Sequence, residues 1–209
     1  MNTTTKYPRT LHLPWSLSAS SDDCWLNNVD HFVGKEIICS VKLDGEGSNL
    51  TATTCHARSV DSRGHASRHW LKAKHGSIAR DIPDGFCIYG ENMYAEHSIP
   101  YSGLTTYFYV FGIKNNNLWL SWDSVCEWCQ LLDLETVPVL YRGIWDEEKV
   151  KACYSKDRLI FGGFQEGYVV RLASEFTDFS KSLAKFVRAN HVQTDEHWME
   201  NWKPNQLCK

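Results

Sequence analysis

The stretch Ile37-Ile38-Cys39-Ser40-Val41-Lys42-Leu43-Asp44-Gly45-Glu46-Gly47 leads from an apolar run through one lysine into a segment of acid and glycine. In an extended strand, alternation places Ser40 and Lys42 on the same side, and Asp44-Gly45 is a turn signal at the strand end. Burial or nearby cations would lower the pKa of such a lysine from about 10.4, and an amine attacks phosphorus only when it is neutral. We therefore interpret Lys42 as a candidate nucleophile. The alternative for this short pattern alone is a charged hairpin end.

Composition indicates one globular domain. The chain has 209 residues, enough for one domain with a sizeable core. Its formal net charge of -3 excludes a uniformly basic nucleic-acid-binding surface, so contact with a polyanion needs a local patch. No apolar run approaches the roughly 18 residues of a membrane span, and the polar start is unlike a signal peptide. The eight cysteines are spread along the chain and are expected to be reduced, so we expect a soluble cytoplasmic protein with no membrane partner.

Strand patterns dominate the chain, with helical patterns between them. Residues 1–34 read as irregular, and residues 35–43 and 48–58 are predicted to pair as a hairpin around Asp44 to Gly47. Helices are predicted over 66–80, 121–132, 146–154 and 195–202, and further strands over 86–93, 107–113, 118–120, 137–141, 166–171 and 183–187. Together these elements predict an α+β domain of antiparallel sheet with helices outside.

Charged residues recur at the ends or edges of the apolar strands, which suggests a cleft between sheets; they are Lys42, Arg58, Glu91, Glu166 and Lys185. In order and type the surrounding segments resemble the motifs of the covalent nucleotidyltransferases, the superfamily of ATP-dependent DNA ligases, RNA ligases and mRNA capping enzymes. The matching segments are Lys42-Leu43-Asp44-Gly45, Tyr89-Gly90-Glu91-Asn92, Tyr109-Val110-Phe111-Gly112-Ile113, Glu166-Gly167-Tyr168-Val169-Val170-Arg171 and Ala184-Lys185-Phe186-Val187-Arg188. The third-motif and fourth-motif forms look most like the RNA ligase family, particularly its nick-sealing branch.

The resemblance implies a nucleotidyltransferase (adenylation) domain of antiparallel sheets flanked by helices, with ATP in a cleft between the sheets. Lys42 would attack the α-phosphate of ATP, expel pyrophosphate and carry AMP. Glu166 would hold Mg²⁺, or Mn²⁺ in its place, which favours neutral Lys42 and offsets charge on the phosphate. Lys185 would contact the α-phosphate oxygens.

The remaining implied contacts are to the rest of the nucleotide. Phe111 would stack on adenine, and Glu91 would accept a hydrogen bond from a ribose hydroxyl. Arg58 would lie near the ribose or a phosphate, and Arg188 would act as a second cation beside Lys185. Taken singly, each of these charges has the simpler interpretation of a solvated or ion-paired residue at a strand end.

The fifth motif departs from the pattern of many relatives, which is Lys-x-Lys. Here Leu183 and Lys185 occupy that spacing, and Arg188 is the candidate to compensate. Only 24 residues follow Lys185 (209 minus 185), too few for an oligonucleotide-binding barrel. We therefore expect residues 1–209 to form a single nucleotidyltransferase domain without a C-terminal barrel of that kind.

The resemblance predicts an ATP-dependent RNA ligase that forms a lysyl-AMP at Lys42, adenylates an RNA 5′-phosphate and joins it to a 3′-hydroxyl. Two alternatives remain: a capping-type guanylyltransferase, which shares Lys-x-Asp-Gly, and an RNA-binding subunit that needs a protein partner for sealing. Nicked duplex, single-stranded end and tRNA break are all compatible with these motifs as substrates, and so is more than one oligomeric state.

Overall fold

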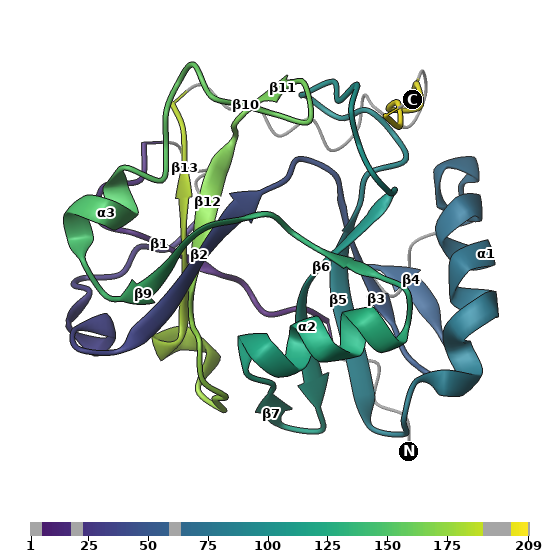
Figure 1. The fold of residues 1–209 in the computed structure, drawn as a ribbon, viewed down its shortest axis with the longest axis horizontal. Coiled ribbons are helices and arrows are strands. Elements are labelled where there is room, and N and C mark those ends of the chain that lie inside the picture. Colours follow the sequence, from purple (N-terminus) through teal and green to yellow (C-terminus); the bar gives the residue numbers. More distant parts are fainter. Residues whose placement is uncertain (1–5, 18–22, 59–63, 190–201, 209) are drawn as a thin grey trace.

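The computed structural model describes residues 6–17, 23–58, 64–189 and 202–208, which form two β-sheets with helices on their outer sides (Figure 1). The predicted α+β class of mostly antiparallel sheet is confirmed. In the described part of the chain, two strand pairs run parallel instead, β1 with β13 and β6 with β8. No helix of these described ranges is long and apolar enough to cross a bilayer.

The first sheet contains the strand that ends at Lys42. This strand, β2, lies between two antiparallel neighbours, β12 and β9. Its register against β9 shifts between Cys39 and Ser40, so the last residues of β2 diverge from the regular pairing. In order across the sheet the strands are β1 (Leu11–His12), β13 (Leu183–Val187), β12 (Gly167–Leu172), β2 (Glu36–Lys42) and β9 (Val139–Ile144).

The second sheet carries the strands of the third motif and of the aromatic motif. A hairpin of two short strands, β10 (Leu159–Ile160) and β11 (Gly163–Phe164), stands apart from both sheets and leads directly into Glu166. In order across the second sheet the strands are β4 (Cys55–Ala57), β3 (Glu46–Leu50), β5 (Phe86–Asn92), β6 (Phe108–Asn115) and β7 (Leu118–Trp119), with β8 (Glu135–Thr136) beside β6.

Two of the helices, α2 and α3, begin where their capping residues place them. Ser121 caps α2 (Trp122–Leu131) by accepting a hydrogen bond from the Ser124 amide, as predicted. Asp146 caps α3 (Glu147–Lys151), which is shorter than the predicted 146–154. The predicted helix 66–80 is confirmed as α1 (His69–Ile78) between two short 3-10 turns. Two further 3-10 turns are Asp30–Phe32 and Phe179–Lys181, and the predicted helix 195–202 falls almost wholly outside the described residues.

The predicted hairpin of residues 35–43 with 48–58 is wrong. β2 and β3 belong to different sheets, and residues 43–45 cross from one sheet to the other. Gly45 makes the crossing possible, because a Cβ there would lie 2.7 Å from the Asn92 carbonyl oxygen and 2.7 Å from the Met93 sulfur. The hairpin partner of β3 is β4, and a turn closed by a Thr51–Thr54 hydroxyl pair at 2.8 Å divides the expected 48–58 strand.

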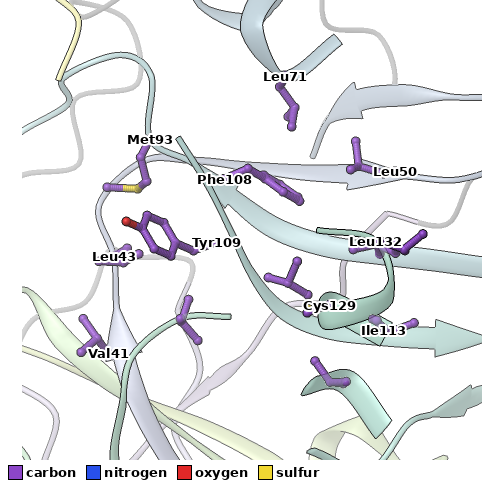
Figure 2. Packing of buried hydrophobic residues seen from close by; sticks show 14 of the residues in the cluster. Val41, Leu43, Leu50, Leu71, Met93, Phe108, Tyr109, Ile113, Cys129 and Leu132 are labelled. Carbon is purple, nitrogen blue, oxygen red and sulfur yellow. The ribbon is translucent and has the colours of Figure 1, made fainter. Parts of the chain in front are cut away.

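Two apolar clusters form the core, one on each side of the crossing. The cluster in Figure 2 joins the second sheet to α1 and α2. It also includes Val41 of β2 and Leu43 of the crossing segment, and Leu43 lies there beside Met93 and Tyr109. The other cluster lies mainly around the first sheet. Phe111 packs against both clusters, so it marks their boundary.

Arg171 of β12 links the two sheets and is almost fully buried. Its guanidinium donates to the carbonyl oxygen of Leu120, just past β7, at 2.5 Å and lies 5.5 Å from the centre of the Trp122 ring. Burial lowers the pKa of Arg171 to about 10, so the group stays charged at neutral pH. The guanidinium therefore satisfies buried carbonyls at the junction of the two sheets.

Replacing Arg171 with alanine should destabilise the fold, because it leaves the Leu120 carbonyl unsatisfied and opens a cavity. We expect the free energy of unfolding to fall by about 3 kcal/mol in urea denaturation. Arg142, an arginine of β9 that is 42% exposed and paired with Asp123 and Glu36, is the control. Arg142→Ala should change the free energy of unfolding by about 1 kcal/mol or less. Equal losses in the two variants would contradict the structural role of Arg171.

Candidate active site

Lys42 and Glu166 meet where the chain leaves the first sheet. Lys42 is the last residue of β2, and its cross-strand partner is Gly167, the first residue of β12. The Lys42 Nζ donates to Glu166 Oε1 at 2.5 Å. The Glu166 side chain is fully buried, whereas the Lys42 side chain keeps 24% of its surface exposed. The structure thus brings the predicted nucleophile and the predicted metal ligand into direct contact, with the lysine still accessible.

Acidic side chains surround the lysine and control its charge. Burial works to lower the pKa of Lys42, but neighbouring carboxylates outweigh burial, Glu166 foremost, and the net pKa is raised. Glu91 and Asp44 add to the same effect. The expectation that burial and nearby cations lower the pKa of Lys42 is therefore wrong for this structure. In the resting protein Lys42 is an ammonium held by Glu166.

Glu91 lies on the opposite side of the crossing, at the end of β5. Its Oε1 accepts a hydrogen bond from the backbone N–H of Gly45 at 3.2 Å. Burial raises the pKa of Glu91 to about 8. The positive charge of Lys42 opposes this rise, but the negative charges of Glu166 and Asp44 add to it. At neutral pH the Glu91 carboxyl therefore retains its proton and can both donate and accept a hydrogen bond.

Asp44 fastens a loop to the crossing segment. Its Oδ2 accepts hydrogen bonds from the Ser98 amide at 2.9 Å, the Ser98 hydroxyl at 2.6 Å and the Ile99 amide at 2.9 Å. The backbone N–H of Asp44 donates to the phenolic oxygen of Tyr101 at 3.1 Å. Burial raises the pKa of the Tyr101 phenol, and the charges of Glu166, Asp44 and Glu91 raise it further. The Tyr101 phenol therefore belongs to the site. Sequence reasoning missed Tyr101, since it stands in a loop that matches none of the motifs.

The side chains of Lys185 and Lys42 project from the same face of the first sheet. The register pairs Ser40 with Val169 and Val169 with Lys185, and directly paired residues project to the same face. The Lys185 Nζ donates to Asp23 Oδ1 at 3.1 Å. Burial lowers the pKa of Lys185, and the charge of Lys42 lowers it further against the opposing hydrogen bond to Asp23.

Two residues of the N-terminal segment accompany Lys185, although the sequence of that segment carries no recognised motif. His12, paired with Lys185 in the strand register, approaches the same Asp23 oxygen with its Nε2 at 3.4 Å. Burial, followed by the charge of Lys185, lowers the pKa of His12 to about 4, so this imidazole is neutral at pH 7. Leu183 is buried in the core rather than in the site, so the lysine that many relatives have at that spacing has no counterpart there.

Phe111 stands at the boundary between the sheets, beside Tyr7. The register of β5 against β6 shifts after Tyr89, and Phe111 is the residue passed over by the pairing. The Tyr7 ring lies 5.0 Å from the Phe111 ring in an edge-on arrangement. Burial raises the pKa of the Tyr7 phenol, and the charges of Arg171, Arg58 and Glu91 also act on it, so Tyr7 interacts electrostatically with two of the predicted site residues. Tyr7 is a second residue of the site region that sequence reasoning missed.

The two predicted arginines occupy different places. Arg58 follows β4; its side chain is exposed, and its amide donates to the Gly47 carbonyl at 2.8 Å. The amide of Arg188 donates to the carbonyl of Glu166 at 3.0 Å. The Arg188 Nε is buried and has no hydrogen-bond partner among the described residues. Arg188 therefore carries a buried side-chain donor and is joined to Glu166 through its backbone.

The site offers a divalent cation carboxylate oxygens, which are the ligands that Mg²⁺ and Mn²⁺ prefer. Within the described ranges no three His, Cys, Asp or Glu side chains come together as a complete metal-binding group. A site for Mg²⁺ commonly has one or two protein carboxylates, with phosphate oxygens and water completing the coordination. Glu166, beside the candidate nucleophile, fits that arrangement.

A family model described as RNA ligase matches residues 35–187, which is more than half of the chain. The chain therefore belongs to the RNA ligase family. None of the curated proteins compared with it matches.

Solved structures of Naegleria gruberi RNA ligase are similar in fold. A variant with ATP and Mn gives a TM-score of 0.57 at 16% identity, over 77% of this chain and 52% of that one. The enzyme with pyrophosphate gives 0.54 at 16% identity, over 77% and 51%. A variant with AMP and Mn gives 0.53 at 16% identity, over 77% and 52%. This chain thus spans about half the length of these relatives.

The protonated Glu91 carboxyl makes stability depend on pH. In the unfolded chain this carboxyl has a pKa of about 4.3, whereas in the folded protein its pKa is about 8. The contribution of this group to stability is full below the unfolded pKa and is lost as the pH rises through the folded pKa. We expect the free energy of unfolding of the wild type, relative to Glu91→Gln, to fall between about pH 5 and pH 8 in urea denaturation.

Glu148→Gln is the control for this measurement, because the Glu148 side chain is 86% exposed on α3. Its unfolding free energy should follow the pH profile of the wild type. Parallel profiles for the wild type and Glu91→Gln would contradict the raised pKa of Glu91.

Proposed function

We propose that this chain is an ATP-dependent RNA ligase that carries AMP on Lys42, transfers it to an RNA 5′-phosphate and joins that end to a 3′-hydroxyl. The observation that carries the proposal is the contact between Lys42 and buried Glu166 at 2.5 Å, in a chain of the RNA ligase family. Complexes of the Naegleria enzyme with ATP, AMP, pyrophosphate and Mn support ATP as the substrate and a divalent cation as cofactor.

In the first step Lys42 Nζ attacks the α-phosphorus of ATP. A nitrogen–phosphorus bond forms, the bond to the leaving oxygen breaks, and pyrophosphate departs. The ammonium form of Lys42 has no free electron pair, so its proton must leave before the attack. Glu166 accepts the hydrogen bond of that ammonium in the resting protein, so a cation bound at Glu166 would displace this contact and favour release of the proton to water.

The metal position follows from the same contact. We place Mg²⁺ or Mn²⁺ on Glu166, with phosphate oxygens and water as further ligands. The bound cation would supply positive charge that offsets charge on the α-phosphate and disfavours the ammonium form of Lys42. Glu166 is suited to this position because it directly precedes β12 and its carboxylate meets the Lys42 Nζ.

The other predicted residues have places that suit nucleotide binding. Phe111 lies between the two sheets, where its ring can stack on adenine, and the protonated Glu91 can bond a ribose hydroxyl. Lys185 lies near Lys42 and would bind the α-phosphate oxygens after they replace Asp23 as the hydrogen-bond partner of its Nζ. The buried donor of Arg188 would meet a phosphate oxygen. Arg58 would reach the ribose side of the nucleotide near Tyr7.

After the first step, the oxygen of an RNA 5′-phosphate would attack the phosphorus of the lysyl-AMP, which frees Lys42 and leaves the RNA end adenylated. Attack by a 3′-hydroxyl on that end would then join the RNA and release AMP. We place this reaction, as RNA repair, in the cytoplasm, which agrees with eight cysteines that all remain free thiols in the structure. A partner protein or a second copy for the sealing step remains part of the proposal.

Incubation with α-labelled ATP and Mg²⁺ should label the protein through a bond that is stable to base and labile to acid. Lys42→Met should take no label, and Lys185→Ala should take it at least about 100-fold more slowly, because a fixed charge at the phosphate is lost. Lys149→Ala, whose lysine is exposed on α3, should label like the wild type. Circular dichroism must show each variant folded. A folded wild type that stays unlabelled would refute the proposal.

Addition of a nicked RNA duplex to the labelled protein should release the label as adenylated RNA end and then as free AMP, with joined strand as the product. Labelled GTP offered in the same way should not label the protein. Labelling by GTP in preference to ATP would identify a capping-type guanylyltransferase. Labelling by ATP without joined RNA would leave only the first step and indicate that sealing needs a partner.

A further inference from the structure

The C-terminal segment 202–208 is bound to the loop that follows β5. The Asn205 amide donates to the Tyr94 carbonyl at 2.9 Å, and the Gln206 amide donates to the Tyr101 carbonyl at 2.9 Å. The Leu104 amide donates back to the Gln206 carbonyl at 3.1 Å. The segment, drawn in yellow at the end marked C in Figure 1, therefore follows the loop as an added edge.

Asn205 is the buried centre of this contact, with only 3% of its surface exposed. Its Oδ1 accepts a hydrogen bond from the Tyr101 amide at 2.8 Å. Its Nδ2 donates to the carbonyls of Met93 at 2.8 Å and Ala95 at 3.2 Å. One side-chain amide thus joins three points of the loop, and it leaves no polar atom of its own unbonded.

Tyr101 connects that contact to the candidate nucleophile. Its backbone N–H is held by Asn205, and its phenolic oxygen accepts the hydrogen bond from the Asp44 amide at 3.1 Å. Asp44 lies two residues after Lys42 and is also held by the Ser98 hydroxyl at 2.6 Å. Residues 99–101 lie outside the strands and helices, so hydrogen bonds such as these determine the path of the loop.

We propose that Asn205 is a positioning residue for Lys42, acting through Tyr101 and Asp44. By holding the Tyr101 amide, Asn205 sets where the phenol meets the Asp44 amide, and this contact fixes the backbone directly after the nucleophile. Misplacement of a reacting group by about 1 Å can cost a large factor in rate, so a loosened turn should slow the attack on ATP. The inference rests on the proposed function, since it assumes that Lys42 receives AMP.

The test is a double-mutant cycle on the single-turnover rate of protein labelling by α-labelled ATP, measured well below the melting temperature of each variant. Asn205→Ala should label about tenfold more slowly than the wild type, with the ATP concentration for half-maximal rate unchanged within about twofold. Tyr101→Phe, which removes only the phenolic oxygen, should also slow labelling. In the Tyr101→Phe background, Asn205→Ala should cause little further loss, because the path to Asp44 is already broken.

Gln206→Ala is the matched control, because its side chain is exposed and its contacts here are made by the backbone. It should label at the wild-type rate. A wild-type rate for Asn205→Ala, or losses that multiply in the double variant, would overturn the positioning role while leaving the proposed function intact. If Asn205→Ala does not fold, an unchanged rate in Tyr101→Phe overturns it instead. An unlabelled wild type refutes the proposed function itself and this inference with it.

Discussion

The ion pair between Lys42 and the buried carboxylate of Glu166 is the constraint on which the rest of the site depends. A fully buried carboxylate needs compensation for the water it has lost, and the lysine ammonium supplies it. The consequence is a raised pKa for Lys42, so the resting protein holds its candidate nucleophile in the unreactive form. Under the proposed function, a cation held by Glu166 would replace the charge of the ammonium, which would link activation of Lys42 to the binding of metal and nucleotide.

The crossing between the two sheets explains why these groups meet. β2 ends in the first sheet and β3 begins in the second, so the residues between them lie between Glu166 on one side and Glu91 on the other. The lack of a side chain at Gly45 permits the close approach to β5. Asp44 then ties the crossing to the loop that carries Tyr101. Hydrogen bonds to Glu91, Tyr101 and Ser98 thereby hold this short irregular segment.

Local patterns predicted much of this fold, because a capping serine such as Ser121 or an apolar strand such as 86–92 depends on neighbouring residues. The same patterns failed at residues 43–45, since a turn signal does not say which sheet receives the next strand. The resemblance to the nucleotidyltransferase motifs assigned Lys42 and Glu166 to one cleft, and in the structure their side chains are in contact. Tyr101, Asn205 and Asp23 were not foreseen, because their roles arise from contacts between residues far apart in the sequence, such as Tyr101 with Asn205.

The most direct test of the account is to locate AMP on the protein after incubation with ATP and Mg²⁺. The protein should be digested under conditions that preserve the phosphoramide bond, and the modified peptide sequenced by mass spectrometry. The account predicts AMP on the peptide that contains Lys42, at that lysine. AMP on Lys185 or any other residue, or no AMP on the folded protein, would contradict it.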